Sequence, residues 1–226
     1  MLRLVEKFLS IQGEGPFAGV ASNFLRVWGC NLKCVWCDSF YAWDVKRSSF
    51  SETFVYTFEE FREDIKKAPL TVITGGEPLL YSRIWEKWIR EVEGGKFQFE
   101  TNGTFPPILK DDARVFFVLS PKLKSSGNEG AIKLDVLRGF VPLILKGRAF
   151  LKFVISDPKN DESEILEILE KLNLSRDIIP FSVFLMPEGT TRELPLAEEV
   201  VKICIKHNFR YSDRIHIRIW GNRRGV

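Results

Sequence analysis

Short apolar runs of strand type alternate with amphipathic stretches of helical type along most of this chain. The runs are rich in β-branched and aromatic residues and occur at positions 24–28, 70–73, 97–99, 115–119, 150–155, 181–185 and 215–219. Alternation of this kind predicts an α/β fold with a parallel sheet flanked by helices. Eight β/α units usually need about 250 residues. A chain of 226 residues therefore favours an incomplete (partial) TIM-like β/α barrel over a closed one.

Helix boundaries are indicated by capping residues. A capping box at Thr57 predicts the start of a helix that ends before Pro69. Ser82 is expected to cap a second helix, which glycines at 94–95 end. Two more helices are expected near 161–172 and 195–207, whereas 125–147 is ambiguous and could include an insertion.

Composition narrows the class of protein. The length suits a single domain over residues 1–226, and 45% hydrophobic residues suffice for a substantial core. No apolar stretch is long enough to span a membrane, and the charged first residues do not resemble a signal peptide. A net charge of +3 gives no support for nucleic-acid binding, although the basic segment 214–224 leaves that alternative open. We expect a cytoplasmic protein, because four cysteines in a chain this long suit a reducing compartment.

Three of the cysteines form one C-x3-C-x2-C run at Cys30, Cys34 and Cys37. Three thiolates can hold three irons of a [4Fe–4S] cluster and leave the fourth iron open to a small molecule. Zinc and electron-carrying clusters normally take four protein ligands. The remaining Cys204 lies in an amphipathic helical pattern and is expected to be a buried apolar residue. The run therefore favours a reactive cluster over a structural one.

Polar motifs follow several of the expected strands. The cysteine run comes after the first, and the motifs at 74–78, 100–103, 120–122 and 187–189 come after later ones. In β/α barrels the loops at the carboxyl ends of the strands build the active site. Each motif taken alone could be an ordinary turn. Together they predict one polar rim that faces the cysteines.

At this point the chain resembles a known family. The cysteine run with Trp36 before its last cysteine, followed by a Gly-Gly-Glu-Pro loop, is similar to the radical S-adenosylmethionine (SAM) superfamily. More narrowly, the chain resembles the 7-carboxy-7-deazaguanine synthases of queuosine-type 7-deazapurine biosynthesis. The passages that carry this likeness are 10–15, Arg26 with 29–30, 37–44 and 220–226. The likeness spans the chain and is weak between about 125 and 147.

The resemblance implies two bound groups, a [4Fe–4S] cluster and SAM. In such enzymes SAM binds the open iron, and one electron from the cluster cleaves it to methionine and a 5′-deoxyadenosyl radical. Cys30, Cys34 and Cys37 would hold the iron, with Trp36 against the adenine and Gly76 allowing a close approach to the methionine end. The full set of implied SAM contacts is Trp36, Cys37, Asp38, Gly76, Ser120, Pro121, Lys122, Leu185, Met186, Pro187 and Glu188.

The resemblance also implies a substrate, 6-carboxy-5,6,7,8-tetrahydropterin, which would contract to 7-carboxy-7-deazaguanine and release ammonia. Arg26 would bind the substrate carboxylate, because the guanidinium fork suits a carboxylate. Ser39 matches the position of a Mg²⁺-binding hydroxyl. The other implied pterin contacts are Ile11, Gln12, Gly13, Thr74 and Val226. A one-electron donor such as flavodoxin or ferredoxin, and a homodimer, would complete the assembly.

Plainer interpretations stay open at this stage. Arg26 could lie on the solvent face of its strand, Ser39 could be a turn residue, Trp36 a core aromatic, and Glu14 a surface carboxylate. Two other functions also remain. One is a radical SAM activase that makes a glycyl radical on a partner protein, and the other is a zinc or electron-transfer module that uses Cys34 and Cys37.

Overall fold

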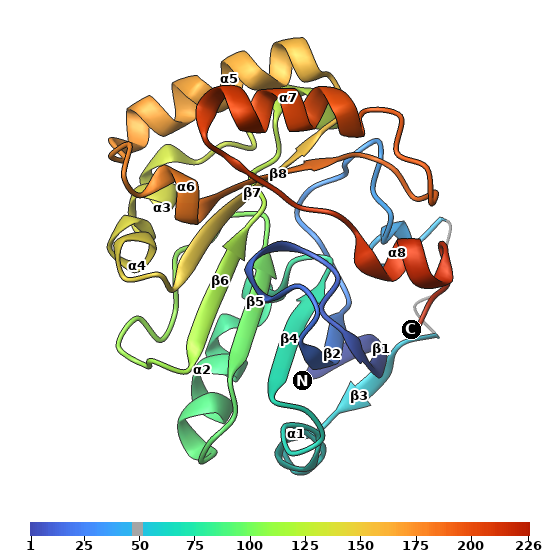
Figure 1. The fold of residues 1–226 in the computed structure, drawn as a ribbon. Coiled ribbons are helices and arrows are strands. Elements are labelled where there is room, and N and C mark those ends of the chain that lie inside the picture. The colour runs from blue at the N-terminus through green and yellow to red at the C-terminus, as the bar shows by residue number, and fades with distance from the viewer. Residues whose placement is uncertain (47–51) are drawn as a thin grey trace.

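The computed structural model describes residues 1–46 and 52–226, and it is built around one open sheet (Figure 1). The sheet has nine strands in the order β3-β1-β2-β4-β5-β6-β7-β8-β9. The strands are β1 Leu2–Ile11, β2 Ala21–Val27, β3 Phe54–Tyr56, β4 Leu70–Gly75, β5 Phe97–Thr101, β6 Val115–Leu119, β7 Ala149–Ile155, β8 Val183–Pro187 and β9 Arg210–Tyr211.

In the order of the sheet, β2, β4, β5, β6, β7 and β8 each pair in parallel with the next strand, up to β9. Strand β1 runs antiparallel to both β2 and β3. The sheet curves without closing, because β3 and β9 are its two edges. This confirms the expected α/β fold and its incomplete barrel. The helices are α1 Phe58–Asp64, α2 Ser82–Glu91, α3 Leu134–Arg138, α4 Val141–Leu145, α5 Pro158–Leu172, α6 Ile179–Ser182, α7 Ala197–His207 and α8 Ile215–Trp220.

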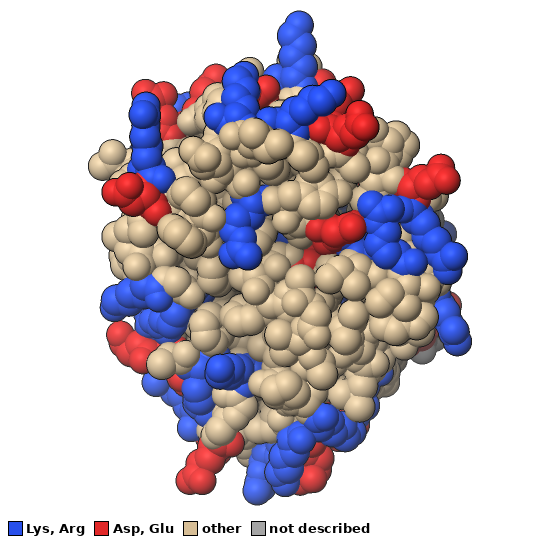
Figure 2. Space-filling view, viewed as in Figure 1, with Lys and Arg blue, Asp and Glu red and all other residues tan. Residues whose placement is uncertain are grey.

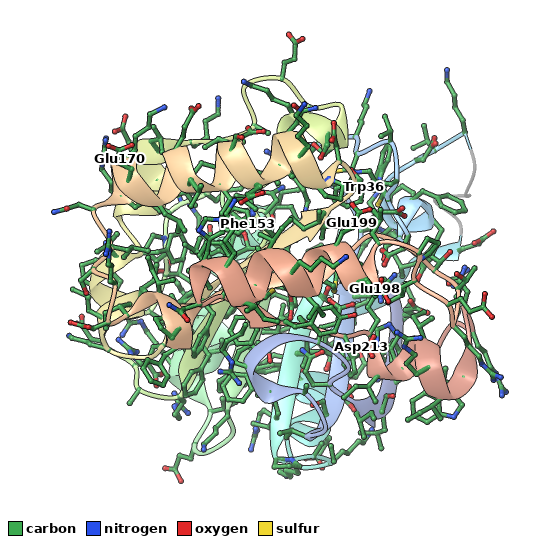
Figure 3. The ribbon with its side chains drawn as sticks, turned by 45° about the horizontal axis from the view of Figure 1, so that its top comes forward. Trp36, Phe153, Glu170, Glu198, Glu199 and Asp213 are labelled. Atoms are coloured by element: carbon green, nitrogen blue, oxygen red, sulfur yellow. The ribbon has the colours of Figure 1, made fainter. Side chains whose placement is uncertain are left out.

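The two faces of the sheet are chemically different. On β2, Phe24 and Arg26 line a cavity, while the intervening Leu25 is fully buried in the core. The same alternation holds on β7, where Lys152 lines the cavity and Phe153 packs into the core beneath α5 and α7 (Figure 3). Successive side chains of a strand point to opposite faces, so one face can carry polar groups while the other packs against helices. We call these the cavity face and the helix face.

Several predicted helix ends are confirmed. The Thr57 side chain accepts from the backbone of Glu60, and the Glu60 carboxylate accepts from the backbone of Thr57, which completes the capping box of α1. Cys204 is 5% exposed within α7, as expected for a buried apolar residue. Ser82 begins α2 but does not cap it, because a short 3-10 turn, η4 Pro78–Tyr81, leads directly into the helix.

Two expected strands differ from the structure. Residues 215–219 form helix α8, although their isoleucines alternate as in a strand. Only Ile217 of this helix is buried, so the alternation does not correspond to a buried sheet face. The expected strand at 181–185 begins only at Val183, since α6 occupies the residues before it. The ambiguous stretch 125–147 contains α3 and α4.

Strands β1, β3 and β9 do not correspond to any of the strands that the sequence predicts, and β1 is the longest of them. Its first residues place Leu2 and Leu4 in the core and leave Arg3 half-buried.

Among the described residues no helix is both long and apolar enough to cross a membrane. On the face shown in Figure 2, basic and acidic side chains are mixed, with basic ones gathered where Figure 1 places α8.

Candidate active site

A cavity of about 240 Å³ lies at the carboxyl ends of the parallel strands. Its walls come from the loop after β1, the cysteine loop after β2, the loops after β4, β5, β6 and β8, and the C-terminal segment with α8. Phe8 and Phe24 stack at its apolar end with ring centroids 4.9 Å apart. The rim that the sequence predicts is therefore present as one concave site.

Most of the predicted site residues line this cavity. They are Ile11, Gln12, Gly13, Arg26, Cys30, Cys34, Trp36, Cys37, Asp38, Ser39, Thr74, Gly76, Ser120, Lys122, Met186, Pro187, Glu188 and Val226. Pro121 and Leu185 are not among the lining residues. Leu185 is fully buried on the helix face, because its neighbour Met186 takes the cavity face of β8.

The cysteine loop presents its three thiols to the cavity, and all three are partly buried. Their sulfurs accept hydrogen bonds from Leu32 N, Asn128 Nδ2 and Trp43 Nε1 at 3.3–3.4 Å. Burial raises the pKa of the Cys30 thiol to about 11 and also raises the pKa of the Cys37 thiol. Metal binding at this loop must therefore displace thiol protons.

The glycines of the Gly-Gly-Glu-Pro loop lie directly against the start of the cysteine loop. A Cβ on Gly76 would come within 2.0 Å of the Gly29 carbonyl oxygen. The backbone N–H of Glu77 donates to that same oxygen at 2.8 Å. Glycine is thus required at this position because two backbones pack against each other. The family resemblance implies a different reason for this glycine, the space that the methionine end of SAM would need.

Glu77 joins the loops after β4 and β5. Its buried carboxylate accepts from Leu79 N at 2.9 Å, Thr101 Oγ1 at 2.8 Å and Asn102 N at 2.7 Å. Burial raises the pKa of Glu77 to about 6 despite these donors. The residue positions the rim and does not line the cavity.

Arg26 points to the cavity, and its guanidinium is held by residues of β1 and of the loop after β2. Its Nε lies 2.6 Å from Glu6 Oε1, and its Nη1 donates to Ser39 Oγ at 2.9 Å. Tyr41 also donates to Glu6, at 2.8 Å. The solvent-face interpretation of Arg26 is wrong, because its side chain is only 16% exposed and lines the cavity. Thr74 is its register partner on β4, so the two residues are neighbours on the cavity face.

A buried cluster of charges lines the same cavity. Lys152 Nζ is 2.5 Å from Glu14 Oε2 and 2.9 Å from Glu100 Oε2, and its side chain is 5% exposed. Gln12 donates to Glu100 at 3.2 Å. Burial opposes charge on all of these groups, yet the two carboxylates raise the pKa of Lys152, and Lys152 with Arg214 lowers the pKa of Glu14. Burial outweighs Lys152 at Glu100 and raises the pKa of that carboxyl.

Arg214 connects three separate parts of the rim. It donates through Nε to Glu14 Oε1 at 3.0 Å, through Nη2 to Asp38, and through Nη1 to the Gly189 carbonyl. Its side chain is 7% exposed, so the basic segment 214–224 turns its first arginine inward. Burial opposes its charge, but Glu14 and Asp38 together raise the pKa of Arg214.

Trp36 and Lys122 face each other across the cavity wall. Lys122 Nζ lies 5.7 Å from the centroid of the Trp36 ring, and it donates to Ser120 Oγ at 2.7 Å. Trp36 Nε1 is buried, and within the described part of the chain it has no hydrogen-bond partner. Figure 3 shows Trp36 on the loop after β2. A buried donor that lines a cavity fits a bound molecule that offers an acceptor.

The residues present fit the groups that the sequence implied. Three half-buried thiols, each with an N–H donor, suit thiolates bound to separate irons of a cluster. Among the described residues, no three cysteine, histidine, aspartate or glutamate side chains are arranged to hold a single metal ion. The unpartnered Trp36 indole and the Lys122 ammonium adjoin the same wall, where a cofactor with polar atoms would be held.

Five ionisable residues line the cavity without being among the predicted site residues, namely Glu14, Glu100, Lys152, Arg214 and His216. Lys152 lies inside an apolar run, which is the same signal that singled out Arg26. Glu100 was seen only as part of a turn motif. Arg214 and His216 were obscured because the stretch at 215–219 resembles a strand.

Comparisons with known proteins agree with this geometry. A family model described as the radical SAM superfamily matches residues 28–175. A 7-carboxy-7-deazaguanine synthase of Hyperthermus butylicus is 35% identical over 97% of this chain and 93% of that protein. One from Halobacterium salinarum is 34% identical over 98% of this chain and 91% of that protein.

Among solved structures, the crystal structure of QueE from Escherichia coli matches with a TM-score of 0.71. The match covers 95% of this chain and 94% of that chain at 24% sequence identity, and it shows a shared fold. The sequence relatives extend over nearly the whole chain at 30% identity or more. The chain therefore belongs to the 7-carboxy-7-deazaguanine synthase family of the radical SAM superfamily.

Proposed function

We propose that this chain converts 6-carboxy-5,6,7,8-tetrahydropterin to 7-carboxy-7-deazaguanine with release of ammonia, in the cavity at the carboxyl ends of the strands. One observation carries the proposal: a cation placed for a carboxylate, Arg26, and a buried polar cluster, Lys152 with Glu14 and Glu100, share one cavity with the three cysteines. Residues 1–226 act as one catalytic unit in this proposal.

The cysteine side of the cavity holds the cofactors of a radical SAM enzyme. Cys30, Cys34 and Cys37 would bind the [4Fe–4S] cluster, and the wall with Trp36 and Lys122 would bind SAM. When bound, these groups supply the one-electron chemistry that removes a hydrogen atom from the substrate. The chain's part is to hold the substrate carbon against the cofactor and to exclude water.

The opposite side of the cavity would hold the substrate. A pterin ring carries N–H donors along its pyrimidine edge, and buried carboxylates such as Glu14 and Glu100 accept such donors well. The substrate carboxylate would lie at Arg26, whose Nη2 makes no hydrogen bond to the described residues. This separation of acceptors from the cation gives the substrate one orientation in the cavity.

Mg²⁺ would bind between Ser39 and the substrate carboxylate. Ser39 Oγ lies 2.9 Å from Arg26 Nη1 and 2.9 Å from Asp38 Oδ1, so hard oxygen ligands stand beside the carboxylate site. Mg²⁺ favours oxygen ligands and keeps several waters, so few protein ligands are needed.

Replacing Ser39 tests the magnesium proposal. Ser39→Ala should abolish the stimulation of turnover by Mg²⁺, because it removes the hydroxyl ligand. Ser39→Thr keeps the hydroxyl and should retain the response. Initial rates measured with and without added Mg²⁺ decide the point. An unaltered response in Ser39→Ala would favour the turn interpretation of this serine.

As a radical SAM enzyme, the chain takes a small-molecule substrate and needs a reductant. The donor in this proposal is a one-electron carrier such as flavodoxin or ferredoxin, because the cluster accepts one electron at a time. A homodimer is the proposed assembly, and sedimentation of the purified protein would show its mass. Family membership argues against both alternatives left open by the sequence, the glycyl-radical activase and the zinc or electron-transfer module.

The direct test of the proposal is an anaerobic assay after cluster reconstitution. The reconstituted protein, SAM and dithionite would be mixed with carboxytetrahydropterin, and the product identified by mass spectrometry. Tetrahydropterin without the carboxylate is the matched control and should not turn over. Cleavage of SAM without consumption of carboxytetrahydropterin would reject the substrate while leaving the radical SAM chemistry in place.

A further inference from the structure

Three side chains outside the C-x3-C-x2-C run donate hydrogen bonds to its sulfurs, and the two shortest of these bonds come from Asn128 and Trp43. Asn128 Nδ2 lies 3.3 Å from Cys34 Sγ, and Trp43 Nε1 lies 3.3 Å from Cys37 Sγ. The third sulfur, that of Cys30, accepts from the backbone N–H of Leu32 at 3.4 Å and more distantly from Asn102 Nδ2 at 3.9 Å. Neither Asn128 nor Trp43 is part of the motif that binds iron, so their contacts need a reason of their own.

The amide of Asn128 is oriented by the backbone around it. Its Oδ1 accepts from the N–H of Lys33 at 2.9 Å, and a backbone N–H can only donate. The NH₂ end of Asn128 must therefore face the other way, toward Cys34 Sγ and the oxygens of Ser126. The Val35 N–H donates to the Ser126 carbonyl at 3.0 Å, which fixes the segment at 126–128 against the cysteine loop.

The position of Trp43 is also fixed by backbone contacts. It follows a short 3-10 turn, η2 Phe40–Ala42, whose last residue accepts from the N–H of Gly29 at 2.7 Å. That bond ties the turn to the residue directly before Cys30. Because an indole N–H can only donate, it stabilises Cys37 Sγ most when the sulfur is negatively charged.

We propose that Asn128 and Trp43 raise the reduction potential of the cluster that Cys30, Cys34 and Cys37 hold. Hydrogen bonds to the sulfurs are among the levers that set such potentials. Reduction adds one negative charge to the cluster and its thiolates, so an N–H dipole aimed at a sulfur stabilises the reduced state more than the oxidised one. Removal of either donor should then make the one-electron reduction by a donor protein or dithionite less favourable.

This proposal rests on the cluster assignment and not on the identity of the pterin. Charged side chains are not needed for the effect, since both donors are neutral. The two residues come from different connections of the fold, Trp43 after β2 and Asn128 after β6, and each contacts a different sulfur. Their contributions should therefore add when both are changed.

The test uses the reconstituted holoenzyme and measures the midpoint potential by redox titration followed by electron paramagnetic resonance. Trp43→Phe removes the N–H and keeps an aromatic ring. Asn128→Asp keeps the oxygen that accepts from Lys33 but replaces the donor by a negative oxygen. Trp88→Phe, on α2 among Tyr56, Phe58 and Phe61, is the matched control. Iron and sulfide content are measured for every variant.

The expected result is a more negative midpoint potential in Trp43→Phe and Asn128→Asp, with a larger shift in the double variant and none in Trp88→Phe. A tenfold change in the one-electron equilibrium would appear as 59 mV. The titration reports on whatever fraction of cluster has assembled, so partial loading does not prevent the measurement. Unchanged potentials at both positions would overturn the proposal. A folded variant that binds no iron would also overturn it, because the replaced residue would then be needed to bind the cluster and not to set its reduction potential. Absence of iron from the wild-type chain would instead reject the cluster itself.

Discussion

Arg26 is a single residue that must satisfy two anions. Its Nε pairs with Glu6 Oε1 at 2.6 Å, and the proposed substrate carboxylate would pair with the other end of the guanidinium. Arg224 supplies a second cation, since its Nε lies 3.6 Å from Glu6 and its guanidinium lies over the Tyr41 ring, 3.8 Å from the centroid. Two arginines against one glutamate leave a positive charge for the incoming carboxylate. Glu6 is thus a positioning residue that fixes the fork without neutralising the site.

Replacing Arg26 with alanine should weaken binding of carboxytetrahydropterin by roughly 2–5 kcal/mol, as when one member of a buried charge pair is removed. SAM cleavage without substrate should persist, because Arg26 is neither one of the three cysteines nor one of the residues expected to contact SAM. Equilibrium binding of the pterin and assay of 5′-deoxyadenosine would measure the two effects. Arg62→Ala, which changes an exposed arginine on α1, is the control. Equal pterin affinity in Arg26→Ala and wild type would exclude Arg26 from the substrate site.

Glu77 gives a prediction about pH. Its pKa in the folded chain is about 6, above the ordinary value of 4.5, because burial penalises the charged form. The folded state therefore binds the proton more tightly than the unfolded state, and this contribution to stability is lost as the pH rises through 6. The full effect is about 2 kcal/mol, of which about 1 kcal/mol falls between pH 5 and pH 7.5.

Glu77→Gln removes this titration, so the stability of the variant relative to the wild type should increase as the pH rises. A change of 1 kcal/mol corresponds to about 2–4 °C in Tm for a chain of this size. Thermal unfolding of both proteins at pH 5 and pH 7.5 would measure the gap in Tm, in which the other titrating groups cancel. A gap that stays constant over this range would show that Glu77 has no raised pKa.

At the scale of elements, the alternation of residues along each strand explains which predictions from the sequence were possible. Apolar runs predict strands well when one face packs against helices, as on β4, β5 and β6. A charged residue inside such a run indicates a cavity face, and the rule that identified Arg26 would also have identified Lys152. Leu185 and Met186 show its use in the other direction, since successive side chains of a strand point to opposite faces, so Met186 lines the cavity while Leu185 packs in the core.

Helix α8 shows where local pattern fails. Its isoleucines alternate as in a strand, but no strand among the described residues pairs with this segment, which bonds to the loop after β1, where Ile215 N donates to Gly13 O at 3.0 Å. That contact joins residues about two hundred positions apart, so no local signal could predict it. The buried ion pairs of Glu14 with Lys152 and Arg214 depend on the same long-range closure.

Arg214 provides the prediction at this scale, because it links the loops after β1, β2 and β8. Arg214→Ala leaves Glu14 and Asp38 with fewer cations and should destabilise the fold by about 3 kcal/mol, near the lower end for a broken buried pair because Glu14 keeps Lys152. Arg218→Ala, which changes the 39% exposed side chain paired with Asp213, should cost less than about 1 kcal/mol. Thermal unfolding of the two variants compares them. Similar losses in both would mean that Arg214 does not connect the rim.

For the whole molecule, closure of the open barrel depends on contact between its two ends. The loop after β1 and the C-terminal segment meet at Gly13, where Ile215 binds the backbone, and at Gly15, whose N–H donates to Ser212 Oγ at 2.9 Å. These contacts cover the cavity on the side where the sheet does not close (Figure 1). The N-terminal and C-terminal parts must therefore both be in place before the site is complete.

Gly13 is the point at which this closure can be tested. A Cβ on Gly13 would lie 2.0 Å from His216 Nδ1, so alanine can be accommodated only if the His216 ring or α8 moves. Gly13→Ala should destabilise the fold by about 1–3 kcal/mol, the range for overpacking. Backbone amides of residues 212–220 should also exchange faster with deuterium. His216→Ala removes the ring that blocks the new methyl group, so the double variant should be at least about 1 kcal/mol more stable than the sum of the single changes predicts. Strict additivity of the two changes, with unaltered exchange in α8, would show that the two ends of the barrel close independently of this contact.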